Sequence, residues 1–189
     1  DYRMPPEHPY PTPLDDCVAV YEAVVKRHPQ VRPMIGGVSA GGNLAAALAL
    51  RVRDEKRVLS PLGAILLSPA LDRTGSGDSF QTHQYIDVVL RTSGGRYGQL
   101  YAAGNDLKDP YLSPLFGEFQ KGFPATFLQS GTRDILLSNV VRMQRALCSA
   151  GVPVELQLWE AMPHGGFGLA PETAEVTAQI RQFADRYWR

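Results

Sequence analysis

The sequence predicts an α/β fold in which helices cover both faces of a mostly parallel sheet. Short apolar runs that leave no room for a helix alternate with longer segments of helical periodicity along most of the chain. Repeated strand–helix alternation is typical of parallel sheets, because each parallel strand needs a crossover connection to the next. The 189 residues are 44% hydrophobic and 20% charged, so one domain spanning residues 1–189 can bury a core of its own.

A proline-rich arm precedes the first helix. Its prolines keep residues 2–13 out of helix and central strand, because proline lacks an N–H donor and fixes φ. Thr12 is expected to cap a helix that has Pro13 at its first position and that ends near His28. The inward stripe of this helix is predicted to comprise Cys17, Tyr21, Val24 and His28.

The remaining strands and helices are predicted in the same way, from short strand-like runs and from helical periodicity. Strands are expected over residues 33–38, 62–68, 126–129 and 154–159, and helices over residues 41–50, 138–150 (capped by Ser138) and from 171 onward. The apolar strand at 33–38 is predicted to be buried. Between about 72 and 103, turn glycines and weak helical patterns around 84–90 and 98–102 indicate an insertion.

Charge and hydropathy bear on partners and location. Lys plus Arg equals Asp plus Glu at 19 each, so the sequence predicts no nucleic-acid partner. No apolar run approaches the roughly 18 residues of a membrane span. Cys17 and Cys148 are predicted to be buried, unpaired thiols, which favours a reducing compartment, namely the cytoplasm. The chain begins at Asp1 and not at a methionine, so the sequence does not exclude a targeting segment upstream of Asp1.

The motif Gly37-Val38-Ser39-Ala40-Gly41 lies where a predicted strand ends and a predicted helix begins. A Gly-x-Ser-x-Gly sequence in this context is the nucleophile elbow of α/β-hydrolases. We expect Gly37 and Gly41 to be required because side chains there would collide in the sharp turn. The helix dipole and the Ala40 N–H would then stabilise an oxyanion beside the Ser39 hydroxyl. The alternative is a glycine-rich turn whose serine caps a helix.

A serine nucleophile needs a base, and the base needs an orienting acid. In α/β-hydrolases the chain order is serine, acid, histidine. His164 follows the last predicted strand and is the expected base. Asp134 follows the preceding strand and is the expected acid, with Asp72 as its competitor. The other histidines, for which no catalytic role is expected, are His8, His28 and His83.

Several segments together resemble the hormone-sensitive-lipase family of esterases, within the bacterial fold-3 group of α/β-hydrolases. They are residues 2–9 (YRMPPEHP), 14–16 (LDD), 37–45 (GVSAGGNLA), 131–134 (GTRD) and 162–165 (MPHG). The resemblance covers nearly the whole chain and implies an α/β-hydrolase fold with Ser39, Asp134 and His164 as catalytic triad. Residues 130–137 and 159–167 look most like bacterial members that hydrolyse small hydrophobic esters or terpene-type lactones.

The chain departs from this family at its start. The family has a His-Gly-Gly-Gly loop upstream of the Tyr-Arg segment that supplies further oxyanion donors, and Asp1 comes after that point. We therefore expect the C-terminal portion of a larger enzyme, without the first strands of the sheet and with a bare edge at the 33–38 strand. By itself the chain is expected to be feeble or inactive, because one lost oxyanion donor costs about 10²–10³ in rate.

The expected function is that of a serine carboxylester hydrolase which forms an acyl-enzyme and needs neither metal nor organic cofactor. Its partner would be a small-molecule ester, held under a cap to which the insertion contributes. The candidate cap residues, for which ordinary packing is an equal alternative, are Phe80, Tyr85, Ile86, Val88, Val89, Leu90 and Tyr97. Lactone hydrolysis by the same residues and a non-catalytic ligand- or partner-binding module stay open as alternatives. The oligomeric state, a homodimer included, is not determined by the sequence.

Overall fold

The computed structural model describes residues 1–91 and 95–188 and has a four-stranded sheet at its centre. The strands are β1 (Ile35–Val38), β2 (Gly63–Leu67), β3 (Ala125–Gly131) and β4 (Val154–Trp159), arranged in chain order. Each neighbouring pair is parallel, which confirms the predicted sheet. Because the strands are parallel, their carboxyl ends lie at one edge, and the loops that follow them can converge there.

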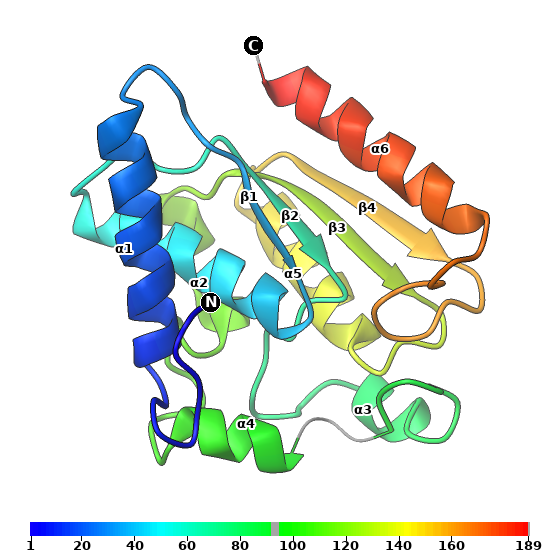
Figure 1. Ribbon diagram of the computed structural model, residues 1–189. Helices are drawn as coiled ribbons and strands as arrows, with labels where there is room; N and C mark the ends of the chain where they lie inside the picture. The colour runs from blue at the N-terminus through cyan, green and yellow to red at the C-terminus, as the bar shows by residue number, and fades with distance from the viewer. Residues whose placement is uncertain (92–94, 189) are drawn as a thin grey trace.

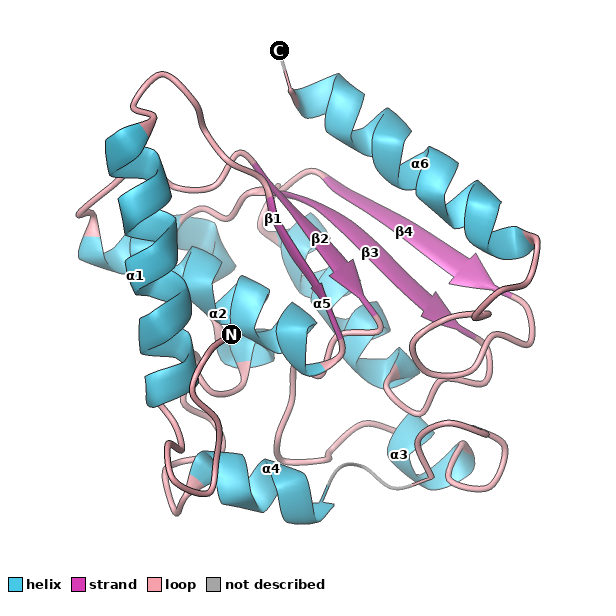
Figure 2. Cartoon of the chain, in the orientation of Figure 1, coloured by secondary structure: helices cyan, strands magenta, loops and turns pink. Residues whose placement is uncertain are grey.

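Helices cover both faces of this sheet (Figure 1). Helices α2 (Ala40–Glu55) and α5 (Leu137–Ser149) pack on one face, α6 (Glu172–Tyr187) crosses the other, and α1 (Thr12–Arg27) packs against α2 (Figure 2). Successive strand side chains point to opposite faces. Leu128 joins the core under α2 and α5, whereas the ring centroid of Phe127 lies 5.7 Å from that of Phe183 in α6. In the part of the chain that the structure describes, no helix is long and apolar enough to cross a membrane.

The predicted insertion folds into two short helices and connecting turns. The helices are α3 (Ser79–Thr82) and α4 (Gly95–Ala102), and two 3₁₀ turns, Pro114–Phe116 and Phe119–Lys121, follow before β3. The pattern at 84–90 is not a helix. The Asp87 side chain accepts hydrogen bonds from the amides of Val89 and Leu90, which competes with helical pairing. Residues 92–94 of the insertion lie outside the described residues.

Two predicted helix caps are wrong. Pro11 occupies the N-cap of α1, with Thr12 already inside the helix, and Leu136 occupies that of α5. Neither Pro11 nor Leu136 caps its helix with a side-chain hydrogen bond. Ser138 instead exchanges two hydrogen bonds with Ser79, each 2.9 Å from amide to hydroxyl oxygen. Its hydroxyl therefore joins the insertion to α5 and does not cap the helix.

The buried faces also differ in detail from the sequence predictions. The buried apolar residues of α1 are Leu14, Val18, Tyr21 and Val25. Val24 and His28 are exposed, so only Tyr21 of the predicted stripe is fully inside. Both cysteines are free as expected, but Cys148 is exposed and Cys17 only partly buried. The apolar residues of a helix can often be grouped into more than one possible buried face. The packing of α1 against α2 determines which of these faces is buried.

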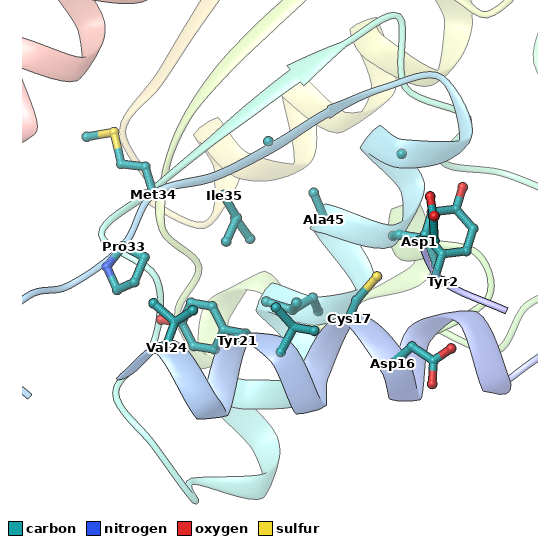
Figure 3. Close-up of a pocket in the computed structure, with 15 residues that line it drawn as sticks. Asp1, Tyr2, Asp16, Cys17, Tyr21, Val24, Pro33, Met34, Ile35 and Ala45 are labelled. Carbon is teal, nitrogen blue, oxygen red and sulfur yellow. The ribbon is translucent and has the colours of Figure 1, made fainter. Parts of the chain in front are cut away.

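Strand β1 forms an edge of the sheet and is not fully buried. Among the described strands it pairs only with β2, and 46% of the Val38 surface is exposed. A groove of about 470 Å³ runs between α1 and this edge. Figure 3 shows Tyr21 and Val24 of α1 on one side of the groove, with Ile35 and Ala45 facing them. The bare edge expected from the sequence is therefore present.

Candidate active site

Ser39 occupies the turn between a strand and a helix by itself. β1 ends at Val38 and α2 begins at Ala40. The backbone angles of Ser39 are φ 55° and ψ −116°, a region that side chains other than glycine rarely adopt. Its amide donates to the Leu67 carbonyl at 2.9 Å and its carbonyl accepts from the Ala70 amide at 3.1 Å. These contacts with β2 and the loop after it hold the strained residue in place.

Two glycines make this turn sterically feasible, and only one of them was predicted. A Cβ on Gly37 would lie 2.3 Å from the carbonyl carbon of Gly41, so Gly37 is required as expected. A Cβ on Gly41 would meet no atom of the described residues within 4 Å, so the collision predicted there is wrong. Gly42 is the crowded position, because its Cβ would lie 2.8 Å from the Cβ of Pro69. The two adjacent glycines in the sequence, Gly41 and Gly42, could have indicated that this turn is crowded.

His164 lies between Ser39 and Asp134. Its Nε2 is 2.9 Å from Ser39 Oγ, and its Nδ1 is 3.1 Å from Asp134 Oδ1. Asp134 is fully buried and His164 is 8% exposed. The three residues follow β1, β3 and β4, so the parallel sheet brings together at one edge side chains that are far apart in sequence.

The surroundings of Asp134 keep its carboxyl ionised. Burial by itself raises the pKa of this carboxyl, but hydrogen bonds from the His164 ring and the Leu136 amide outweigh it, and the pKa lies below its ordinary value. The Ser130 hydroxyl donates a further hydrogen bond, 2.8 Å long, to Oδ2. Because a carboxylate only accepts, Nδ1 of His164 must carry the proton and Nε2 is free to accept from Ser39.

The other candidates from the sequence lie elsewhere or have other contacts. The Asp72 carboxylate binds Arg142 at 2.7 Å and does not contact His164. His83 lies near the site, but its Nδ1 is 2.9 Å from the backbone oxygen of Asp134 and not from its carboxylate. The two remaining histidines are exposed on the surface; they are His8 and His28.

Besides Gly42, sequence reasoning missed two residues that shape the site. Asp87 is buried, with Oδ2 2.9 Å from the Ile135 amide and Oδ1 3.4 Å from the His164 amide. Nothing in the local sequence distinguished this carboxylate. A Cβ on Gly131 would lie 2.0 Å from the Met162 carbonyl oxygen, so glycine is needed for the loop before His164 to cross the end of β3. Its position in the Gly-Thr-Arg-Asp segment could have indicated this.

Ser39 and Ala40 line a cavity of about 500 Å³, here called the Ser39 cavity. Ala40 is the first residue of α2, so its N–H has no acceptor within the helix. The wall is mainly apolar and includes Met4, Pro6, Leu44, Leu90, Leu100 and Leu136. Among residues 1–91 and 95–188, no group of three or more His, Cys, Asp or Glu side chains is placed to hold a metal.

The predicted cap residues divide into three groups. Leu90 and Tyr97 line the Ser39 cavity. Phe80 is buried beneath it with Ile135 and Leu136. The others are exposed on the surface of the insertion; they are Tyr85, Ile86, Val88 and Val89.

Comparison with known proteins shows the family to which the chain belongs. A sequence model of the α/β hydrolase fold matches residues 1–168. The chain belongs to the α/β-hydrolase fold family. An esterase of Acinetobacter venetianus is 34% identical over 97% of the chain, and an acetyl-hydrolase of Streptomyces hygroscopicus is 33% identical over 86% of it. The chain spans 62% and 54% of the lengths of these two relatives.

Solved α/β-hydrolase structures match the chain over its full length. The crystal structure of an esterase has a TM-score of 0.92 at 39% identity, and that of a hormone-sensitive lipase from a metagenome library has 0.91 at 33% identity. The chain covers 59% and 65% of these two proteins. The predicted fold class and the resemblance to the hormone-sensitive-lipase family are thereby confirmed.

Proposed function

We propose that the protein is a serine carboxylester hydrolase with Ser39 as nucleophile, His164 as base and Asp134 as orienting acid. One observation carries the proposal. Ser39 Oγ, the two ring nitrogens of His164 and Asp134 Oδ1 form a continuous hydrogen-bonded row, with separations of 2.9 and 3.1 Å. This row begins in the Ser39 cavity and ends in the buried interior, as a charge-stabilising triad requires. Relatives named as esterases support the same reaction class.

The proposed reaction has two halves that use the same residues. Ser39 Oγ attacks the ester carbonyl while His164 Nε2 takes its proton, and Asp134 stabilises the resulting imidazolium. The developing oxyanion accepts a hydrogen bond from the Ala40 N–H at the start of α2. His164 returns the proton to the leaving alcohol, which leaves an acyl group on Ser39. Water then attacks the acyl-enzyme with His164 as base, and the acid is released.

The substrate class that fits best is a small, largely hydrophobic ester. A cavity of about 500 Å³ lies in the size range of small-ligand sites, and its wall is mainly apolar. We assign the insertion at 72–103 to a cap over this cavity, since Leu90 and Tyr97 contribute to its wall. The rest of residues 1–189 would then be a single hydrolase domain that supports the site.

Labelling of the full-length protein with a fluorophosphonate probe, read by intact mass, tests the proposal. Ser39→Ala and His164→Ala should abolish labelling, and Asp134→Asn should slow it by about 10³–10⁴, because asparagine favours the wrong histidine tautomer. Ser149→Ala, at an exposed serine that ends α5, serves as the control. Undiminished labelling of Ser39→Ala would contradict the assignment. A panel of short-chain esters and lactones then separates ester from lactone hydrolysis, and folded protein that is never labelled would favour a binding module.

A further inference from the structure

The wall of the Ser39 cavity contains a guanidinium that forms no ion pair with any described residue. Arg73 follows β2 and lines the cavity together with Ser39. The residue keeps some exposed surface, but its Nε atom is fully enclosed and has no hydrogen-bond acceptor among the described residues. The guanidinium carbon lies 5.4 Å from the centroid of the Tyr101 ring, which also lines the cavity. The ring gives Arg73 a face to stack on but does not neutralise its charge.

The carboxylates next to Arg73 in sequence and next to Tyr101 in space have other partners. Asp72, the preceding residue, binds Arg142 through Oδ2 at 2.7 Å. Asp109 accepts hydrogen bonds from the Tyr10 hydroxyl at 2.8 Å and from the Tyr111 amide at 2.9 Å. Burial lowers the pKa of Arg73, which is the direction expected for a cation that lacks a counter-ion. An unpaired buried charge is costly, so a guanidinium at this position indicates an anionic partner supplied from outside.

The tyrosine beside Arg73 carries no charge. The Tyr101 hydroxyl is enclosed and has no hydrogen-bond partner in the described part of the chain. Burial raises the pKa of Tyr101 to about 12, so the phenol stays protonated at neutral pH and can donate. Tyr101 is held from its other side by the Tyr10 ring, edge to face at 5.9 Å between centroids. Because the hydroxyl is enclosed, it does not contact the cavity, and the exposed surface of Arg73 is the charged part of a cavity wall that is otherwise mainly apolar.

We propose that the guanidinium of Arg73 binds a carboxylate of the substrate, so that the preferred esters carry a carboxylate on one of their two halves. The planar guanidinium suits this group because it can donate two parallel hydrogen bonds to a carboxylate. A half-ester of a dicarboxylic acid would place the charge on the acyl side, and an ester of a hydroxy acid would place it on the alcohol side. This inference rests on the proposed function and specifies its substrate class.

Matched substrate pairs on the full-length protein test it. On the acyl side, para-nitrophenyl hemiglutarate is compared with para-nitrophenyl hexanoate, which has a neutral chain of similar length. On the alcohol side, the acetate ester of γ-hydroxybutyrate is compared with pentyl acetate. In at least one of the two pairs, the wild type should hydrolyse the ester that carries a carboxylate with a kcat/KM about 10- to 100-fold higher than that of the neutral ester. This ratio is expected for a charged hydrogen bond in an enclosed site. The larger of the two preferences assigns the carboxylate to one half of the ester.

The Arg73→Met variant should lose most of this preference, mainly through a higher KM for the anionic substrate, because the contact exists before the transition state. Arg73→Lys should keep part of it, since a lysine retains the charge without the planar fork. Arg145→Met, which removes the same charge from an exposed position of α5, should leave the preference unchanged. If Arg73→Met does not fold, Arg73→Gln takes its place, and the wild-type ratio remains decisive.

Two results would overturn the inference and leave the proposed function intact. The first is that the wild type hydrolyses the neutral ester of both pairs faster than the charged one, while hydrolysis of these esters still requires Ser39. The other is an Arg73→Met variant that keeps the wild-type preference, which would indicate that Arg73 is neutralised by another part of the protein. A wild type that hydrolyses none of these esters and is not labelled by the fluorophosphonate would instead contradict the proposed function itself.

Discussion

The Asp87 carboxylate accepts a hydrogen bond from the backbone amide of Ile135, 2.9 Å away and one residue beyond Asp134. Its other oxygen lies 3.4 Å from the His164 amide. A single buried carboxylate in the insertion therefore contacts both loops that carry the proposed acid and base. The insertion that forms part of the cavity wall thus also fixes the position of these two loops relative to each other.

Asp87→Asn should lower kcat by about 10- to 100-fold with a smaller change in KM, because loops displaced by as little as ~1 Å lose catalytic alignment. An amide group can present only one acceptor oxygen, so its NH₂ would face a backbone N–H. The free energy of unfolding should fall by about 1–3 kcal/mol for the same reason. Steady-state kinetics and the rate of fluorophosphonate labelling, both corrected for folded protein, give the two readouts.

The matched control for Asp87 is Asp78→Asn, an exposed carboxylate in the same insertion. It should behave as the wild type in both assays. An Asp87→Asn variant that is destabilised but keeps the wild-type kcat would show that Asp87 supports the fold alone and does not position the site.

Gly131→Ala should disrupt the site more severely. The added Cβ would lie 2.0 Å from the Met162 carbonyl oxygen, a contact with backbone that cannot rotate away. We expect the free energy of unfolding to fall by about 1–3 kcal/mol or more, as for other overpacked positions, and labelling of Ser39 to be lost. Urea denaturation and intact mass measure the two effects.

Gly98→Ala is the corresponding control, because its Cβ would meet no described atom within 4 Å and the residue lies inside α4. Its stability should change by no more than about 1 kcal/mol, in the stabilising direction set by helix propensity. Equal losses in the two variants would argue against the close approach of Gly131 and Met162.

Asp72→Asn tests the ion pair between Asp72 and Arg142 through its pH dependence. Burial raises the pKa of this carboxyl, but hydrogen bonds from Thr74, Ser76 and Arg142 outweigh it, and the pKa lies below its ordinary value of 3.8. A carboxyl whose pKa is lower in the folded than in the unfolded state stabilises the fold above its unfolded pKa. That stabilisation is lost as the pH falls through the folded pKa.

The wild type should therefore be more stable than Asp72→Asn at pH 7, by about 1–3 kcal/mol, a typical value for hydrogen bonds to a charged group. The difference should stay constant down to roughly pH 5 and narrow progressively below about pH 4, near the reference pKa of aspartate. Chemical denaturation of both proteins across this range measures it. A difference that widened on acidification would mean that the pKa is raised and not lowered.

Much of the architecture could be predicted because it depends on local patterns. The last strand was predicted at residues 154–159 from the alternation of apolar and polar residues there, and it has those bounds. Ser39, Asp134 and His164 were chosen from a turn motif and from chain order, and the structure brings their side chains together. One of the predictions that failed is the cap role of Ser138, whose hydroxyl bonds to Ser79 across the fold.

The order of strands and helices, and therefore which loops meet at the carboxyl edge of the sheet, could be predicted from local sequence patterns, because periodicity and parallel connectivity are properties of neighbouring residues. Three features could not be predicted in this way: Asp87 contacts the loops of both Asp134 and His164, Gly42 and not Gly41 is crowded in the elbow, and Arg73 has no counter-ion within residues 1–91 and 95–188. Each of these depends on the distance between atoms that lie far apart along the chain, and such distances are set by packing and by the competition among hydrogen-bond partners.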